Sequence, residues 1–92
     1  MVRVLLPSLL RPLADGASEV MLPGAPGSVD EAFALLWRTH PALRDRVLTE
    51  TGEVREHVQV FVGRESIRFS GGLATALPGD VEVSIVPAVS GG

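Results

Sequence analysis

The sequence predicts an α+β fold in which one main helix packs on one face of a mixed sheet of four to five strands. Three observations predict it. Apolar residues alternate at a spacing of two near both ends and in the middle of the chain, a capped segment has apolar positions at helical spacing, and turn residues separate these segments. With 92 residues, 46% of them hydrophobic, the chain forms one domain.

Two strands are expected near the amino-terminal end. Val2, Val4 and Leu6 recur at period two, and Pro7 ends that segment. Residues 18–22 form a second extended segment that ends at a Pro-Gly pair. We expect the two strands to form a hairpin with a connection longer than a tight turn.

The main helix is predicted from a capping box and an apolar stripe. Ser28 is followed three residues later by Glu31, whose side chain is expected to reach back to the backbone N–H of the cap. Apolar residues then follow at i, i+3, i+4, i+7 and i+8: Val29, Ala32, Phe33, Leu36 and Trp37. Pro41 disfavours helical geometry at His40, so the helix ends there, and a further helical turn is expected over residues 42–48.

The second half of the chain supplies the remaining strands. Residues 57–62 and 81–86 alternate in the manner of strands, and residues 67–69 are expected to be a short extended piece. Residues 70–77 are expected to be a loop that leads to a Pro-Gly turn. The order ββαββ, with a helix across a mixed sheet, is a β-grasp arrangement.

Composition excludes several classes of function. The chain has no cysteine, which excludes disulfides and thiolate chemistry, and all eight basic residues are arginine, which excludes a P-loop or Schiff-base lysine. His40 and His57 lack metal-ligand spacing, so no metal site is expected. The net charge of −3, without a basic patch, argues against nucleic-acid binding. These exclusions favour a carrier or binding module over an enzyme.

Membrane association and secretion are not expected either. No stretch approaches the roughly 20 apolar residues of a membrane span. The apolar run near the amino-terminal end is interrupted by Pro7 and Pro12, unlike a secretory signal. We therefore expect a cytoplasmic protein.

The glycine pair in Ser70-Gly71-Gly72 has two interpretations. Its backbone amides could cradle a phosphate, but no nucleotide-binding glycine motif surrounds it. A turn is therefore the expected interpretation.

The open face of the sheet is a candidate docking surface. If the alternating valines face the helix, Leu5, Phe61 and Val86 point the other way. Single exposed apolar residues are common, but three on neighbouring strands would form a patch suited to a partner.

The carboxyl end is the candidate reactive part. We expect a domain over residues 1–86, followed by a flexible tail over residues 87–92 that reads Pro87-Ala88-Val89-Ser90-Gly91-Gly92. Glycine has no Cβ, so Gly91 and Gly92 can thread a narrow channel. A free carboxylate is ionised at neutral pH and is a poor electrophile, so its reaction requires activation by an ATP-using partner.

Several runs resemble a known family, the ubiquitin-like sulfur carriers of the ThiS and MoaD type, and within it the carrier of the cysteine-biosynthesis branch. The similar runs are residues 9–12, the strand segment 58–62, the segment Ile67-Arg68-Phe69-Ser70-Gly71-Gly72-Leu73-Ala74-Thr75-Ala76, and the ending 85–92. The double-glycine ending is shared by many ubiquitin-like proteins, whereas the run from residue 68 to residue 76 is more specific.

The resemblance implies a mechanism. An E1-like adenylyltransferase would adenylate the Gly92 carboxylate with ATP, and sulfur from a persulfide donor would replace AMP, leaving a C-terminal 1-thioglycine. The thiocarboxylate would then donate sulfur to a synthase, such as a PLP-dependent cysteine synthase, and a metallopeptidase would release the product. The chain itself would bind no cofactor. Gly91 and Gly92 would carry the reaction, and Leu5, Phe61, Val86 and residues 87–90 would contact partners.

Four alternatives remain open at this stage. A small subunit of a molybdopterin-type synthase would use the same tail. A ubiquitin-like modifier would instead become attached to lysines of other proteins, and a plain interaction module would not need the glycines. Sulfur could also be delivered to a metabolite other than cysteine.

Overall fold

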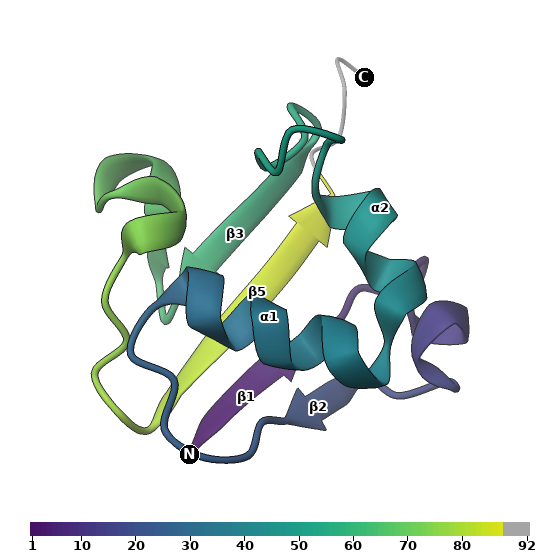
Figure 1. The fold of residues 1–92 in the computed structure, drawn as a ribbon, viewed down its shortest axis with the longest axis horizontal. Coiled ribbons are helices and arrows are strands. Elements are labelled where there is room, and N and C mark those ends of the chain that lie inside the picture. Colours follow the sequence, from purple (N-terminus) through teal and green to yellow (C-terminus); the bar gives the residue numbers. More distant parts are fainter. Residues whose placement is uncertain (88–92) are drawn as a thin grey trace.

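The computed structural model describes residues 1–87 and has the predicted arrangement, with a main helix lying across one face of a mixed sheet (Figure 1). The strands are β1 (Val2–Leu5), β2 (Glu19–Met21), β3 (Val58–Val62), β4 (Glu65–Ser66) and β5 (Val81–Pro87). The α-helices are α1 (Val29–Thr39) and α2 (Arg44–Val47). Short 3₁₀-helices lie at η1 (Arg11–Ala14), η2 (Pro41–Leu43), η3 (Ile67–Phe69) and η4 (Gly72–Ala74).

The first and last strands lie side by side in the middle of the sheet. The strand order is β2-β1-β5-β3-β4, and β1 and β5 are parallel while every other neighbouring pair is antiparallel. Val4 is paired with Val83, and Ile85 with Val60. Because side chains alternate along a strand, this register puts the valines and isoleucine of three central strands on one face.

That face and the stripe on α1 form the core. Phe33 and Leu36 of α1 are fully buried against the sheet, and the rings of Phe33 and Trp37 lie 5.1 Å apart between centroids. Other buried apolar residues include Val2, Val4, Leu6, Val29, Leu43, Val47, Val58, Val60, Ile67, Val83 and Ile85. The predicted helical stripe and three strand faces therefore meet in one core.

The ends of α1 follow from local sequence. The Ser28 hydroxyl accepts a hydrogen bond from the Glu31 backbone N–H at 3.2 Å, as predicted for the N-cap. The Glu31 carboxylate, however, accepts from the Ser28 hydroxyl at 3.3 Å rather than from the cap backbone. At the other end, the His40 N–H donates to Leu36 O at 2.9 Å, and Pro41 starts η2. The further helical turn expected over residues 42–48 is present as η2 and α2.

Residues 62–69 differ from the prediction. Residues 67–69 form the 3₁₀-helix η3 rather than an extended piece, because the Ser66 hydroxyl caps the Arg68 N–H at 3.4 Å and Ile67 is buried. A two-residue strand, β4, precedes η3 and pairs with the end of β3. The turn between β3 and β4 has Gly63 at a φ of 61°, a conformation that favours glycine at the first position of a two-residue hairpin.

The loop expected over residues 70–77 contains η4 and is fixed by one buried threonine. The Thr75 hydroxyl donates to Gly72 O at 2.6 Å and lies 3.1 Å from the Ser70 hydroxyl. The Thr75 carbonyl accepts from the Val29 N–H at 3.0 Å, which ties the loop to the start of α1. The segment Ser70-Gly71-Gly72 is thus a turn held against the helix, in agreement with the favoured interpretation.

No helix in the described part of the chain is both long enough and apolar enough to cross a bilayer.

The cap of α1 makes a prediction about stability. Replacing Ser28 with alanine removes the acceptor of the Glu31 N–H, so we expect Ser28→Ala to lower the free energy of unfolding by about 1 kcal/mol. The measurement is urea denaturation, with an unchanged slope. Ser8→Ala is the matched control, because Ser8 is exposed outside the helices and strands, and it should change stability by less than about 0.5 kcal/mol. Equal losses in the two variants would contradict the capping role.

Candidate functional site

The three predicted open-face residues lie close together on neighbouring strands. Ser84 of β5 is paired with Leu5 on one side and with Phe61 on the other, so all three side chains share one face. Val86 is two residues further along β5 on the same face, opposite Gln59. Leu5, Phe61 and Val86 therefore surround Ser84, and we call these three residues the open-face patch.

The patch is graded in exposure. Leu5 and Phe61 are half-buried, whereas Val86 is 41% exposed. The most accessible part of the patch thus lies near the carboxyl end of β5, from which the tail departs. A partner that engages the tail from this side would meet Val86 first.

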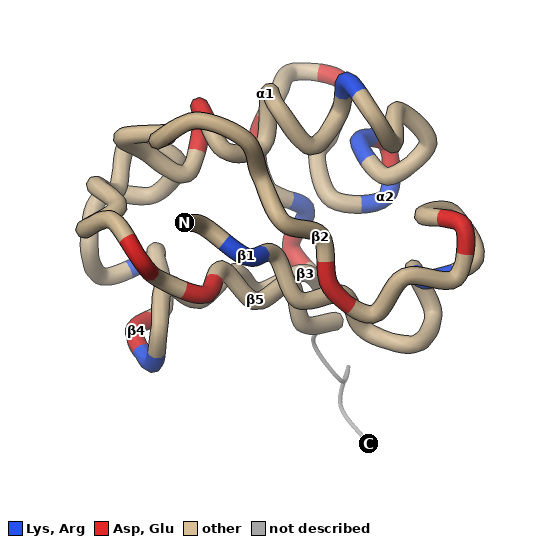
Figure 2. Tube along the Cα trace, turned by 90° about the horizontal axis from the view of Figure 1, so that it is seen from below, with Lys and Arg blue, Asp and Glu red and all other residues tan. Residues whose placement is uncertain are grey.

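The opposite end of the open face is charged. The Arg3 guanidinium lies 2.8 Å from the Glu82 carboxylate and 3.9 Å from that of Glu19, so one arginine of β1 lies between acids of β5 and β2. Figure 2 shows this alternation as blue on β1 between red on the two neighbouring strands. These pairs are surface-exposed and contribute about 0–1 kcal/mol each, so their main effect is to mark this end as polar.

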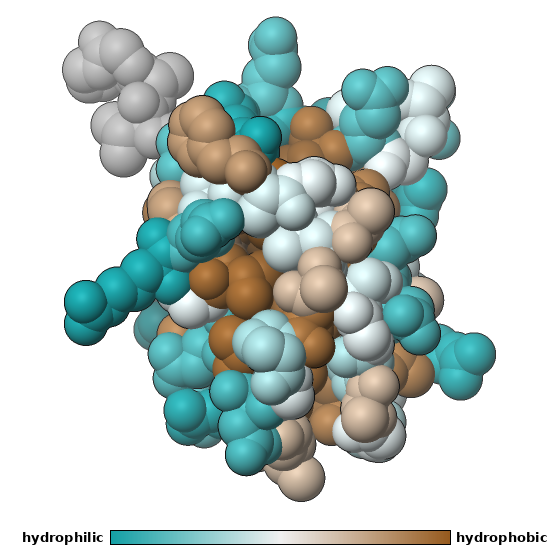
Figure 3. Space-filling view, turned by 90° about the vertical axis from the view of Figure 1, so that its left-hand side faces the viewer, coloured by the Kyte–Doolittle hydropathy of each residue, from teal (hydrophilic) through white to brown (hydrophobic). Residues whose placement is uncertain are grey.

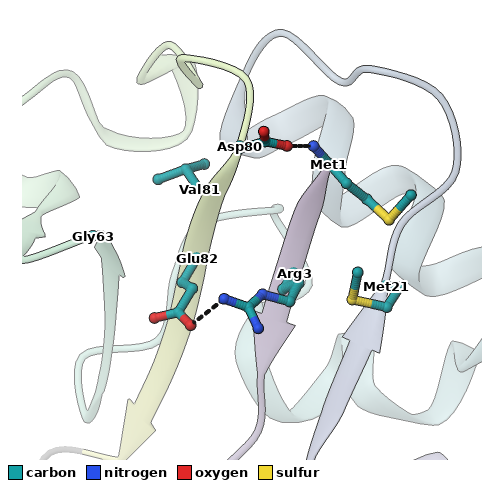
Figure 4. Close-up of a pocket in the computed structure, with 7 residues that line it drawn as sticks. All are labelled: Met1, Arg3, Met21, Gly63, Asp80, Val81 and Glu82. Carbon is teal, nitrogen blue, oxygen red and sulfur yellow. Dashed lines mark hydrogen bonds and ion pairs between the residues drawn. The ribbon is translucent and has the colours of Figure 1, made fainter.

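A shallow hollow of about 450 Å³ lies at this charged end (Figure 4). The amino group of Met1 is paired with the exposed Asp80 carboxylate, and Met1 and Met21 supply its apolar wall. The hollow holds no group of residues suited to catalysis, because the Asp80 carboxylate is paired with the amino group of Met1 and the Glu82 carboxylate with the Arg3 guanidinium.

The structure describes the tail only at its first residue. Pro87, which was predicted to begin the tail, is the last residue of β5 and is paired with Val58. The other predicted tail residues, Ala88, Val89, Ser90, Gly91 and Gly92, lie outside the described residues.

An apolar groove, missed by sequence reasoning, borders this end of β5. It has a volume of about 430 Å³. Leu9 is 79% exposed there, and Arg46 and His57 are the polar residues at its border. The other lining residues are Pro7, Leu10, Pro12, Leu13, Val58, Ile85 and Pro87.

A second hollow, also missed, lies on the side of the molecule that carries η3 and η4. Figure 3 shows this side, where apolar side chains reach the surface. The hollow has a volume of about 340 Å³, and Val54, Ile67 and Leu73 contribute to its wall. Phe69 of η3 is 85% exposed. For Leu9 the available signal was an apolar residue outside any predicted strand or helix period. Phe69 gave no such signal, because it was expected in an extended piece over residues 67–69 that the structure shows to be the 3₁₀-helix η3.

The described residues contain no cluster of three or more His, Asp or Glu side chains that could hold a metal ion. What they present is a set of apolar surfaces around the end of β5. Such an arrangement can bind other proteins and position a chain end.

Comparison with known proteins identifies the family. The family model described as the ThiS family matches residues 4–92. The chain belongs to the ThiS family. The sulfur carrier protein CysO of Mycobacterium tuberculosis is 33% identical to this ThiS-family chain over 93 residues, covering 99% of the chain and 98% of CysO.

Solved structures agree with this assignment. CysO in the Amycolatopsis orientalis BexX/CysO complex matches with a TM-score of 0.88 and 32% identity, covering 100% of both chains. The small archaeal modifier protein 1 of Methanosarcina acetivorans matches with a TM-score of 0.80 and 31% identity, covering 99% of this chain and 95% of that one. The β-grasp fold and the resemblance to sulfur carriers, both predicted from the sequence, are confirmed. The chain is a sulfur carrier of the ThiS and CysO type and not an enzyme.

The graded exposure of the open-face patch makes a second prediction. We expect Phe61→Asp to lower the free energy of unfolding by about 1–2 kcal/mol, because it puts a charge at a half-buried position beside β5. Val86→Asp should cost about 0.5–1 kcal/mol less, because Val86 is 41% exposed and its replacement removes less buried apolar surface. Urea denaturation of both variants measures the difference. Equal losses would show that the two positions are buried alike.

Proposed function

We propose that this chain carries sulfur as a thiocarboxylate on Gly92 and delivers it to a biosynthetic enzyme. The observation that carries the proposal is the full-length similarity to a protein named as a sulfur carrier, which extends through the double glycine. The geometry supports it, because β5 runs directly toward the tail and apolar surfaces lie on both of its faces at that end.

The chemistry requires partners at each step. An oxygen of the Gly92 carboxylate attacks the α-phosphorus of ATP on an E1-like adenylyltransferase, pyrophosphate leaves, and an acyl-adenylate forms. The terminal sulfur of a partner persulfide then attacks the carbonyl carbon and displaces AMP. A second thiol cleaves the resulting S–S bond, which leaves a 1-thioglycine on this chain and a disulfide on the partner.

In this proposal the chain contributes docking and presentation. The domain, which includes β5 through Pro87, is held by its partner through the open-face patch, and residues 88–92 enter the partner's active site. Ala88, Val89 and Ser90 contact the walls of the partner's entrance channel, while Gly91 and Gly92 pass through its narrowest part because they lack a Cβ. ATP is bound by the partner and no cofactor by this chain. Because the partners use ATP, the proposal places the carrier in the cytoplasm.

The acceptor is proposed to be a sulfur-accepting synthase. The relative from Amycolatopsis orientalis was solved in complex with BexX, so a protein of this fold forms complexes with a second protein. A PLP-dependent cysteine synthase fits the CysO similarity, with the thiocarboxylate sulfur attacking an activated serine. A metallopeptidase would then remove the added residue and restore Gly92.

A second candidate function is attachment to other proteins. It is favoured by the similarity to small archaeal modifier protein 1 at 31% identity. Both functions begin with the same adenylate, and they differ in whether its carbonyl carbon is transferred to a persulfide sulfur or to an amine of another protein.

Mass spectrometry of the intact chain tests the proposal. After incubation with ATP, a persulfide donor and the adenylyltransferase of the same organism, we expect a mass increase equal to the difference between one sulfur and one oxygen atom. Deleting Gly92 should abolish the increase and leave the urea denaturation curve unchanged. Loading of the truncated chain would overturn the assignment to Gly92, and adducts on lysines of other proteins would favour the modifier.

The open-face patch can be tested separately. We expect Val86→Asp to raise the Kd for the adenylyltransferase at least about tenfold, because a charge replaces an apolar contact at the protein interface. Ala34→Asp is the matched control: it adds the same charge at an exposed position on α1, across the molecule from the open face, and should leave the Kd unchanged. Isothermal titration calorimetry measures both values. An unchanged Kd for Val86→Asp would exclude the patch from this interface.

A further inference from the structure

The apolar groove and the open-face patch lie on opposite sides of the end of β5. Val86 belongs to the open face, whereas Ile85 and Pro87 line the groove on the helix side of the sheet. Pro87 is also the last residue of β5, so the groove borders the point at which the chain leaves the sheet. A protein that holds the chain at this point therefore lies beside the groove.

The wall of the groove is apolar and is attached to the core at both ends. Leucines and prolines of residues 7–13 form most of it, among them Leu9, which is 79% exposed. The Arg11 Nε donates a hydrogen bond to Leu6 O at 3.1 Å, and both Leu6 and Ala14 are buried. The groove is thus already formed in the free domain, which reduces the entropic cost of binding to it.

The border of the groove is basic although the chain as a whole is acidic. The chain has 11 acidic and 8 basic residues, but no residue that lines the groove is acidic. Arg46 of α2 and His57, which precedes β3, lie at the border and are exposed. Within residues 1–87 Arg46 forms no ion pair, because the neighbouring Asp45 is paired with Arg44 at 3.4 Å. The border is therefore complementary to a carboxylate that approaches from outside.

The second hollow, near η3 and η4, has neither property. Its lining includes both an acid and a base, Glu53 and Arg68, and the Arg68 guanidinium donates to Glu56 O at 3.1 Å. No residue of β5 lines it. Of these two apolar surfaces, only the groove combines a basic border with a position at the end of β5.

We propose that the apolar groove is a second docking site for the adenylyltransferase and receives an apolar side chain of that enzyme with a carboxylate beside it. The apolar side chain packs against Leu9 and Leu13, and the carboxylate pairs with Arg46. The choice of this partner rests on the proposed function, because an enzyme that holds the reactive end must surround the chain where it leaves β5. With the open-face patch, the groove lets the enzyme contact the end of β5 from both sides.

Leu9→Asp tests the apolar contact. We expect this variant to raise the Kd for the adenylyltransferase at least about tenfold, because a charge replaces a side chain against which the enzyme packs. Leu9 is exposed and lies outside the helices and strands, so the midpoint of urea denaturation should not change. Ala34→Asp is the matched control, because Ala34 is exposed on α1 and does not line the groove, and its Kd should not change. Isothermal titration calorimetry measures both values.

Arg46→Glu tests the ion pair. We expect it to raise the Kd about five- to tenfold at low ionic strength. Most of this effect should disappear at about 1 M salt, where the Debye length is roughly 3 Å. Arg64→Glu is the matched control, because Arg64 is exposed in the turn after β3, whereas the groove lies at the start of that strand. It makes the same change in net charge and should alter the Kd less than about twofold.

Three results would overturn the proposal. The first is an unchanged Kd for either Leu9→Asp or Arg46→Glu. The second is an equal effect of Arg46→Glu and Arg64→Glu, which would show that net charge alone matters. The third is self-association of the wild-type chain in sedimentation equilibrium that Leu9→Asp abolishes, which would assign the groove to a second copy of the chain.

The outcome is separable from that of the proposed function. Both groove variants retain Gly92, so sulfur loading at saturating adenylyltransferase should still occur, with a KM for the carrier raised by about the same factor as the Kd. A Kd that depends on the groove, without sulfur loading of the wild-type chain, would refute the proposed function alone. Sulfur loading of the wild-type chain with a Kd independent of the groove would refute the second docking site alone.

Discussion

The parallel pairing of β1 with β5 is the constraint on which the rest of the structure depends. It brings the first and last strands together in the middle of the sheet, where both are covered by α1 on one face. Parallel neighbours require a long connection, and here that connection is most of the chain. A strand in this position cannot be lost without loss of the core. The tail is therefore attached to the most firmly held strand of the sheet, which suits a chain end that other proteins must find in a fixed place.

Side chains alternate along β5, so one face of the strand contributes to the core and the other to the open face. Val83 and Ile85 are buried under the helix, whereas Ser84 and Val86 lie on the open face between β1 and β3. The alternation that buries Val83 and Ile85 in the core therefore also determines which residues of β5 lie on the open face. The open-face patch and the apolar groove therefore lie on opposite sides of the same strand.

Much of this could be predicted from the sequence, because the signals were local. The cap at Ser28, the stripe on α1 and the alternating strands each depend on spacing within one element. Placement of Leu5, Phe61 and Val86 on one face followed from the same alternation, although their adjacency required the register. The sequence-based predictions were wrong or incomplete where contacts between distant segments determine the local structure. Ile67 reads as a strand residue, but its burial and the Ser66 cap produce a 3₁₀ turn. The groove around Leu9 exists only because η1 and α2 meet near the end of β5.

Sulfur carriers and modifiers share this architecture because both functions require the same thing of the domain: a rigid body that presents a slender end to an activating enzyme. The fold therefore does not distinguish them, and in the proposed mechanism the difference lies in the nucleophile that reaches the adenylate. Here the sequence adds one asymmetry. All eight basic residues are arginine, so the chain offers no lysine side chain on which a second copy could be attached. The chain therefore cannot form polymeric conjugates linked through its own lysines. A sulfur carrier acts as a single molecule, so the absence of lysine does not affect that function.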